Sequence, residues 1–326
     1  MRELNDKLRH SLIIKFSMLE SKRLEWLDIA KGVAIILMVL GHTSIPDQLS
    51  NFIFAFHMPL FFIASGWCTD WTKDNYGAFV LKKMRTLGIP FLVYSVSVII
   101  IAWLAGYQGI ELRGVLIKGW EGYALWFVPV LFLSLVIAKS IMCFINIAWF
   151  RYAVCLLLIL GGALLRYYHI YLGWTLATVP YATCLVLLGS SLRYFQQYVD
   201  NPRLWIFVVG LILTITISQN WRLDLAWNNI IPVVILTVGA ISGTVMVFTL
   251  SSWLNKQTRL LFVSKVLMAI GKETFIIMAF SQIIIVALNL HTEWGSAIRY
   301  ACLAVALAIL ACLKNFVNHI VGKRVL

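Results

Sequence analysis

Charged residues are scarce in this chain. Only 13% of its 326 residues are Asp, Glu, Lys or Arg, whereas 61% are hydrophobic and the mean hydropathy is +0.87. A soluble domain carries about 25% charged residues, so the composition excludes an ordinary soluble globular protein. It predicts instead an all-α, polytopic membrane protein.

Cysteine is also sparse, and no two cysteines form a Cys-x-x-Cys pair. All six lie within or beside apolar stretches, so neither a disulfide framework nor a thiolate metal site is indicated. We expect them to be small buried hydrophobic residues, and we expect no bound metal. No glycine-rich loop that would cradle a phosphate is present either, so side chains at the membrane surface would have to hold any nucleotide.

Ten apolar runs are long enough to cross the roughly 30 Å hydrocarbon core of a bilayer. We therefore predict about ten transmembrane helices, near residues 27–45, 51–69, 86–106, 122–143, 147–165, 170–190, 204–219, 228–250, 268–290 and 296–316. No linker, repeat or soluble domain interrupts them, so residues 25–326 are interpreted as one membrane domain.

The basic residues predict how this domain is oriented. The net charge is +13, but the Lys and Arg residues lie between apolar segments rather than in one patch, which argues against nucleic-acid binding. With the N-terminus inside, 22 of the 27 basic residues fall on the cytoplasmic side and five on the outer side. By the positive-inside rule, both termini are expected to be cytoplasmic.

Residues 1–24 precede the membrane domain and are expected to be cytoplasmic. They carry charges throughout and lack the compact apolar core of a cleavable signal peptide. Apolar residues three or four apart favour an amphipathic helix on the membrane surface. The alternative is a dispensable extension, since Met18 can itself be a start.

The first apolar helix carries three ionisable residues on one face. Lys31 and His42 are eleven residues apart, which brings them to the same side of a helix and about 16 Å apart along its axis. Asp28 lies one turn before Lys31. Such groups usually face a bundle interior or an aqueous cavity, so we place the chemistry here, with His42 as a general base. The alternative is that His42 only hydrogen-bonds a neighbouring helix.

A second histidine, His57, falls in the outer half of the next helix. The two imidazoles flank the same short outer turn, SIPDQLSN, so their proximity is expected. For His57 a catalytic role and a packing role stay equally open.

A basic cluster stands at the cytoplasmic mouth of the third helix. Lys82 and Arg85 are three residues apart, with Lys83 between them, and residues at this spacing are neighbours on a helix. Two cations suit a phosphate or diphosphate. The competing interpretation is that these residues only mark the topology.

Three further residues are candidates for binding a substrate. Trp126 opens the fourth helix just past Glu121, and its ring can serve as a platform for a sugar or as an interfacial belt residue. Glu273, at the start of the ninth helix, can cap that helix or face a cavity. Glu121, Trp126 and Glu273 are therefore kept as candidate substrate-binding residues.

Five segments resemble the acyltransferase-3 family of membrane O-acyltransferases, which modify bacterial surface glycans. These segments are RLEWLDIAKGVAIILMVLGH (23–42), FAFHMPLFFIASG (54–66), KKMRTLGIPFLVY (82–94), LWFVPVLF (125–132) and IGKETFIIMAF (270–280). WLDIAKG and FHMPLFF are similar to the branch that includes fucose 4-O-acetylases. The resemblance implies that His42 is the catalytic base and that Lys31, in a place more often held by Arg, is its basic partner. Lys82 and Arg85 match a basic-x-x-Arg motif associated with acyl-CoA.

The chain departs from the family pattern near its end. Many relatives carry a histidine seven residues after the position matched by Thr274, where this chain has Ser281. No hydrolase-like domain follows the membrane part, so we expect the stand-alone form, a multi-pass protein of the bacterial cytoplasmic (inner) membrane.

The resemblance implies an O-acetyltransferase. Acetyl-CoA is the expected donor substrate and no cofactor is permanently bound. The acceptor is the hydroxyl of a surface polysaccharide or of its lipid-linked precursor, and the remaining partner is the lipid bilayer. We favour direct transfer, because no Ser or Cys is obviously paired with a base. A transporter or flippase is the rival class, although the prolines within the spans lack the two-half symmetry that favours transport.

Overall fold

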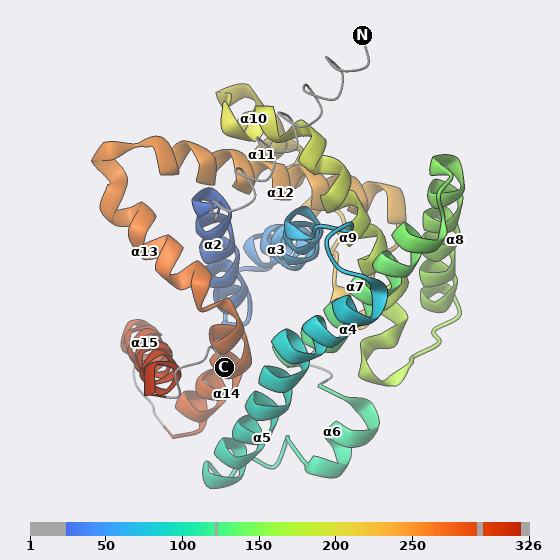
Figure 1. Cartoon of the computed structure of the whole chain (residues 1–326). Helices are drawn as coiled ribbons and strands as arrows, with labels where there is room; N and C mark the ends of the chain where they lie inside the picture. Colours follow the sequence, from blue (N-terminus) through green and yellow to red (C-terminus); the bar gives the residue numbers. More distant parts are fainter. Residues whose placement is uncertain (1–23, 121–122, 292–295, 321–326) are drawn as a thin grey trace.

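Helices make up the regular structure of this protein (Figure 1). The computed structural model describes residues 24–120, 123–291 and 296–320. No strand occurs among these residues, which confirms the predicted all-α class. The predictions made for residues 1–24 fall almost wholly outside the described part of the chain.

The first two helices are joined by a short turn and pack against each other. α2 (Glu25–Gly41) ends at His42, and α3 (Asp47–Cys68) begins directly after Pro46. The proline explains the turn, because the residue before a proline is disfavoured in the α region and a proline fits the start of a helix. α3 lies in the middle of the bundle, in contact with α2, α9 (Val179–Leu192) and α12 (Val233–Lys256).

The central helices meet at glycines. A Cβ atom on Gly66 of α3 would lie 1.8 Å from the carbonyl oxygen of Val186 on α9, and one on Gly189 of α9 would lie 2.0 Å from that of Ile63 on α3. α2 and α13 (Leu261–Lys272) approach each other in the same way. Small residues allow membrane helices to pack backbone against backbone, so these glycines set the spacing of the core.

The third span is longer than predicted. α4 (Tyr76–Lys83), a π-helix at Met84–Gly88 and α5 (Ile89–Leu104) run on as one helix of 29 residues. Asn75 caps its start by accepting a hydrogen bond from the Ala78 amide at 2.8 Å. The predicted basic cluster therefore lies on a continuous helix that begins about ten residues before the expected position.

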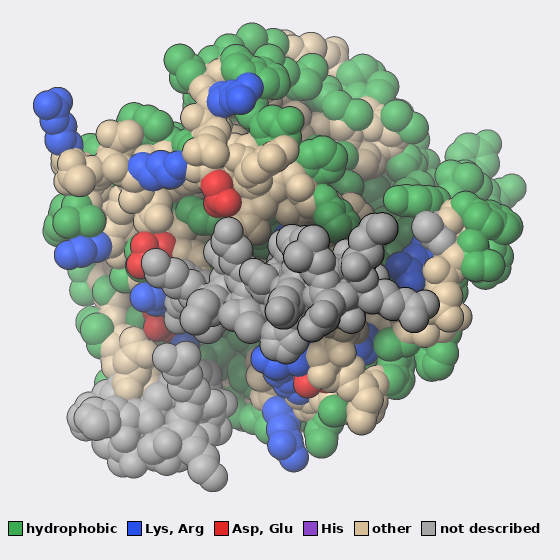
Figure 2. All heavy atoms as spheres, turned by 45° about the horizontal axis from the view of Figure 1, so that its top comes forward, with side chains coloured by type: hydrophobic (Ala, Val, Ile, Leu, Met, Phe, Trp, Pro, Cys, Tyr) green, Lys and Arg blue, Asp and Glu red, His purple; other side chains and the backbone are tan. Residues whose placement is uncertain are grey.

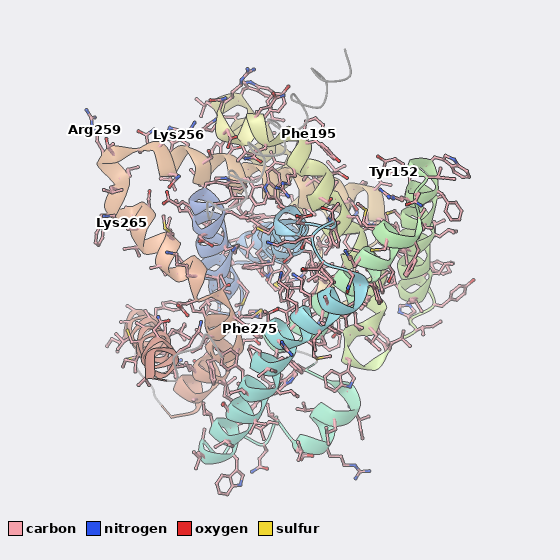
Figure 3. The ribbon with its side chains drawn as sticks, in the orientation of Figure 1. Tyr152, Phe195, Lys256, Arg259, Lys265 and Phe275 are labelled. Atoms are coloured by element: carbon pink, nitrogen blue, oxygen red, sulfur yellow. The ribbon has the colours of Figure 1, made fainter. Side chains whose placement is uncertain are left out.

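Seven more helices complete the described bundle. They are α6 (Leu112–Lys118), α7 (Phe127–Phe144), α8 (Ala148–Tyr167), α10 (Gln196–Asp200), α11 (Leu204–Ser218), α14 (Thr274–His291) and α15 (Ser296–Ile320). Short 3-10 turns join several of them, including Ala124–Trp126 before α7 and Leu225–Trp227 between α11 and α12. α8 and α15 are peripheral, since only 6% and 11% of the residues in their most apolar stretches are buried inside the protein. Tyr152 of α8 points away from the bundle (Figure 3).

Seven helices in the described residues are long and apolar enough to cross a membrane, or eight if one bent pair counts as a single span. Two of the ten predicted runs correspond to shorter helices, α2 with 17 residues and α11 with 15. A helix of 15 residues is only about 22 Å long. The count of ten and the cytoplasmic termini stay predictions.

The ninth predicted helix, 268–290, is wrong as a continuous span. α13 ends at Lys272, α14 starts at Thr274, and the two axes are bent by 80°. The apolar pattern runs through this point, but α13 packs along α2, and Glu273 between the two helices binds α15. Tertiary contacts therefore break the helix where the sequence period does not.

The end of the bundle at the top of Figure 1 carries charge. Lys256, Arg259 and Lys265 are exposed at and next to the corner between α12 and α13 (Figure 3), and Lys256 donates a hydrogen bond to the Asp200 carbonyl of α10. In Figure 2 this end is turned forward, and Lys and Arg side chains are scattered on it among apolar ones. This is the end that the basic residues predict to be cytoplasmic.

The cysteines are less buried than predicted. Cys68, Cys143 and Cys312 are exposed, and none of the six forms a disulfide. The prediction that they are buried is wrong for these three. Cys68 is the last residue of α3, so it lies at the end of the central helix, whereas Cys312 lies on α15, a peripheral helix on which apolar side chains can face lipid.

Candidate active site around His42

Three adjoining cavities meet at His42. Their volumes are about 370, 320 and 30 Å³, and the largest, called here the His42 cavity, falls in the range of roughly 300–1,000 Å³ that is typical of small-molecule sites. His42 follows the last residue of α2 and is half-buried. Its ring makes no side-chain hydrogen bond to the described residues, so it is available to a ligand.

Four parts of the chain line the His42 cavity. Its lining residues are Gly41, His42, Thr43, Phe54, Tyr123, Ala124, Trp126, Arg222, Asp224, Ala226, Trp227 and Gln282. They come from the α2–α3 segment, the turn before α7, the segment between α11 and α12, and α14. Of the three predicted substrate-binding residues, Trp126 lies here.

His57 joins His42 at the smallest of the three cavities. The ring centroid of Phe54 lies 6.0 Å from that of His42 and 4.9 Å from that of His57. His57 is 2% exposed, and its Nδ1 lies 2.8 Å from the Ile53 carbonyl oxygen. Because a carbonyl only accepts, Nδ1 carries the proton and Nε2 is left as an acceptor. The structure therefore brings the two predicted histidines together.

The segment 219–232 is called here the outer loop because the basic residues predict it on the outer side, and it is shaped by its own polar residues. Asp224 and Asn229 exchange backbone hydrogen bonds of 3.1 and 2.8 Å, and the Asp224 carboxylate accepts one from the Ala226 amide at 3.1 Å. Asn228 has a φ of 48°, a left-handed conformation in which Asn is enriched. These contacts hold Arg222, Asp224 and Trp227 toward the cavity.

Arg222 is anchored on three sides. Its Nη1 donates to Ser50 Oγ and Asn51 Oδ1, both at 3.0 Å. The guanidinium lies 3.8 Å above the centroid of the Phe54 ring, and Nε is 3.8 Å from the Asp224 carboxylate. Burial raises the pKa of Asp224, while the charge of Arg222 opposes this rise. The result is a single cation fixed beside the histidines.

Gln282 and two tyrosines complete this region. The Ala124 amide donates to the side-chain oxygen of Gln282 and thereby ties the turn before α7 to α14. The Tyr123 hydroxyl donates to Tyr107 at 2.8 Å. Burial and this hydrogen bond raise the pKa of Tyr123, so its phenol stays protonated at neutral pH.

Lys31 and Asp28 lie at the other end of α2. Their side chains form an ion pair of 3.0 Å, and Asp28 is buried. α2 is continuous between Lys31 and His42, so the expected separation of about 16 Å is kept. Lys31 lines none of the three cavities around His42.

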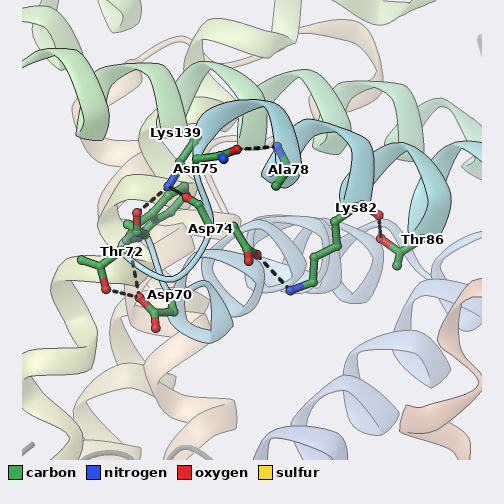
Figure 4. A network of polar contacts seen from close by, with 9 residues as sticks. Asp70, Thr72, Asp74, Asn75, Ala78, Lys82, Thr86 and Lys139 are labelled. Atoms are coloured by element: carbon green, nitrogen blue, oxygen red, sulfur yellow. Dashed lines mark hydrogen bonds and ion pairs between the residues drawn. The ribbon is translucent and has the colours of Figure 1, made fainter.

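The predicted basic cluster is only partly open to a ligand. Lys82 pairs with Asp74 at 3.1 Å (Figure 4), and Lys83 lies 5.3 Å from the centroid of the Phe79 ring. Arg85 is exposed on the π-helix, a distortion that is frequent at functional sites.

A buried lysine that the sequence did not single out supports this cluster. Lys139 of α7 is 1% exposed and donates to the carbonyl oxygens of Trp71 and Asp74 at 2.6 and 2.7 Å (Figure 4). The loop that carries Asp74 is therefore fixed to α7.

Glu273 lies apart from the His42 cavity. It binds Lys314 at 2.7 Å and Asn315 at 3.3 Å, both on α15. Glu121 falls outside the described residues. Sequence reasoning missed Arg222, Asp224, Trp227 and Gln282, and only Arg222 carried a signal, as one of five basic residues predicted on the outer side.

Residues 24–319 match the acyltransferase-3 family, an acyltransferase domain, and the chain therefore belongs to this family. Membership and the apolar helices together make the protein a multi-pass membrane acyltransferase. The predicted family is thereby confirmed, whereas the likeness to the fucose 4-O-acetylase branch stays a prediction. No curated protein and no solved structure matches the chain.

Proposed function

We propose that this acyltransferase moves an acetyl group from acetyl-CoA to a sugar hydroxyl of a bacterial surface polysaccharide or of its lipid-linked precursor. The observation that carries the proposal is the meeting of three cavities at His42, a residue whose ring has no other hydrogen-bonding role among the described residues. Trp126 and Trp227 add aromatic faces to the same cavity, which suit a sugar ring.

The reaction follows from the chemistry of imidazole. His42 takes the proton of the sugar hydroxyl while the oxygen attacks the thioester carbonyl carbon. The carbon–sulfur bond then breaks, and the leaving thiolate of CoA takes the proton from His42. General acid–base catalysis of this kind contributes about 10²–10⁴-fold in rate. His57, at the smallest of the three cavities, is the second candidate base.

The donor is proposed to bind at the cytoplasmic end of the bundle. Lys31, Lys83, Lys82 and Arg85 supply cations for the phosphates of CoA. The separation of about 16 Å between Lys31 and His42 is left for the pantetheine arm to cross. The protein would thus work in the bacterial inner membrane, with the acceptor entering at the end that holds the outer loop.

One observation favours the rival class, a transporter or flippase. α13 and α14 form a helix pair broken by 80°, and interrupted helices are frequent at transporter binding sites. An acyl-transfer assay separates the two classes, because a transporter forms no ester.

The test uses the full chain purified in detergent or nanodiscs. We expect acetyl-CoA to bind in calorimetry and the acetyl group to appear on a lipid-linked sugar by mass spectrometry. Surface glycans from cells without the gene should lack the same acetyl increment. If the wild type neither binds acetyl-CoA nor forms an acetylated product, the proposal is contradicted and the transporter is favoured.

The basic cluster is tested by replacing two cations together. Lys82→Ala with Arg85→Ala should raise the KM for acetyl-CoA more than the KM for the acceptor, by at most about tenfold per residue, since charge-assisted hydrogen bonds contribute about 1.5–3 kcal/mol when fully formed. Raised salt should mimic the defect. Lys256→Ala with Arg259→Ala, two exposed cations at the same spacing, is the matched control. Equal KM values in both double variants would leave Lys82 and Arg85 as topology markers.

A further inference from the structure

The reaction proposed above creates a negative charge that needs a partner. When a hydroxyl oxygen attacks the thioester, the carbonyl oxygen becomes an oxyanion, and preorganised positive groups or hydrogen-bond donors lower the energy of that state. Among the described residues that line the three cavities around His42, Arg222 is the only Lys or Arg.

Arg222 is held in place while keeping donors to spare. Its Nη1 makes both hydrogen bonds to α3, and its Nε faces Asp224 at 3.8 Å, which is too long for a hydrogen bond. Nη2 has no hydrogen-bond partner among the described residues. The guanidinium therefore combines a fixed position with unused N–H groups in the same cavity as His42.

The loop that carries Arg222 is itself fixed to the bundle. Asn229 donates to the Arg222 carbonyl at 2.7 Å, Thr178 donates to Leu225 at 2.6 Å, and Asn228 donates to Gly162 at 3.0 Å. A donor that does not reorganise during the reaction stabilises charge far better than one that must move.

We propose that Arg222 is a catalytic residue of this chain, whose guanidinium stabilises the oxyanion formed on the acyl carbonyl oxygen. The new bond joins the sugar oxygen to the carbonyl carbon, the carbon–sulfur bond breaks, and His42 carries the proton from the hydroxyl to the departing thiolate. Arg222 holds the charge on the carbonyl oxygen between these two steps. This inference rests on the acyl transfer proposed above.

The charges of the cavity favour a transient oxyanion over a permanently anionic acceptor. Asp224 lies next to Arg222 and lines the same cavity, so an acidic sugar would meet a carboxylate as well as a cation. Arg222 and His42 both line the His42 cavity, so the base and the guanidinium face the same space.

A structural role is the competing explanation, because Arg222 fastens the outer loop to the start of α3. Four variants separate the two roles. Arg222→Met removes the charge, Arg222→Gln removes it but keeps an amide donor for α3, and Asn51→Ala removes one anchor while keeping the guanidinium. Arg113→Met replaces an exposed arginine of α6 that lines none of these cavities and serves as the matched control.

The measurement is steady-state acetyl transfer at saturating donor and acceptor, with thermal unfolding of each variant. We expect Arg222→Met and Arg222→Gln to lower kcat by roughly 10²–10³-fold, the usual loss for one oxyanion-stabilising group, with the KM for acetyl-CoA little changed. Arg113→Met should keep kcat near that of the wild type. Asn51→Ala keeps the guanidinium and the hydrogen bond from Arg222 to Ser50, so it should lower kcat far less than Arg222→Gln does.

Two results would overturn the inference. A normal kcat in Arg222→Gln would do so, and so would an equal fall of kcat in Asn51→Ala, which would assign the whole effect to the anchor. If Arg222→Met fails to fold, Arg222→Gln decides by the same criterion. A wild type without transfer activity would remove the proposed function and this inference together, whereas an active wild type with an active Arg222→Gln variant would remove only the role of Arg222.

Discussion

At the scale of single residues, the two ends of α2 do different work. Asp28 and Lys31 pair with each other at one end, while His42 faces three cavities at the far end. The sequence placed these groups on one stripe, and the helix keeps that spacing. Residues on one face of a helix thus need not form one site, because the rise of 1.5 Å per residue separates those at its two ends.

His42 is the residue whose loss should matter most. We expect His42→Ala to lower acetyl transfer by about 10²–10⁴-fold, because the general base is lost. The abundance of the His42→Ala variant in the membrane should stay close to that of the wild type, because the half-buried His42 ring makes no side-chain hydrogen bond to the described residues. His169→Asn, at an exposed histidine with a φ of 51° that Asn tolerates, is the control. A well-expressed His42→Ala variant with full activity would return His42 to a packing role.

Lys139 should affect the binding of acetyl-CoA without contacting it. Lys139→Met leaves two carbonyl oxygens without their charged donor, each bond being worth roughly 1.5–3 kcal/mol, and frees the loop that carries Asp74. We expect a lower unfolding temperature and a raised KM for acetyl-CoA, with kcat at saturation nearly unchanged. Lys73→Met, at an exposed position of the same loop, should change neither quantity. An unaltered KM in a destabilised Lys139→Met variant would confine Lys139 to stability.

At the scale of elements, close helix crossings fix the position of α3, which carries Phe54 and His57. Gly66 and Gly189 bring the backbones of α3 and α9 into contact, and no side chain fits there. The histidines depend on this packing, since α3 is the central helix of the bundle (Figure 1).

Alanine substitutions at two glycines, one at the crossing of α3 and α9 and one on α8, test this close packing. In Gly66→Ala the new methyl group would meet a backbone carbonyl at 1.8 Å, so we expect destabilisation of roughly 1–3 kcal/mol from overpacking. Gly161→Ala on α8 meets nothing within 4 Å and should be neutral or stabilising by up to about 1 kcal/mol. Thermal unfolding in one detergent compares the two. Equal melting temperatures would contradict the proposed crossing.

At the scale of the whole molecule, the bundle has a charged end and an end that holds the outer loop. The topology predicts that Asn220, exposed on the outer loop, is reached from outside the cell and that Thr258, exposed between α12 and α13, is reached from the cytoplasm. In a variant whose native cysteines are replaced by Ser, Asn220→Cys should react with a membrane-impermeant thiol reagent in intact spheroplasts. Thr258→Cys should react only after permeabilisation. The reverse pattern, or a reporter fused after Leu326 that is active outside, would invert the topology.

Local patterns determined much of this protein from the sequence alone. The scarcity of charge and the length of the apolar runs fixed the helical membrane class, because a bilayer core admits few charged groups. The spacing of Lys31 and His42 is kept in the structure because α2 is unbroken from Lys31 to Gly41 and His42 follows as its C-cap. A short turn after the first helix was also predicted, at SIPDQLSN, although α3 already begins within that segment, at Asp47.

The tertiary structure decided which of these groups meet. Arg222, Asp224 and Trp227 reach His42 only because the outer loop folds back on itself and fastens to Ser50 and Asn51 of α3, which lie 172 and 171 residues from Arg222 along the chain. Gln282 arrives from α14 beyond a bend that packing against α2 imposes. Helical periodicity specifies which face of an element is apolar, but it carries no information on which distant face that surface will contact. The cavity around His42 is therefore a property of the packed bundle and not of any one segment.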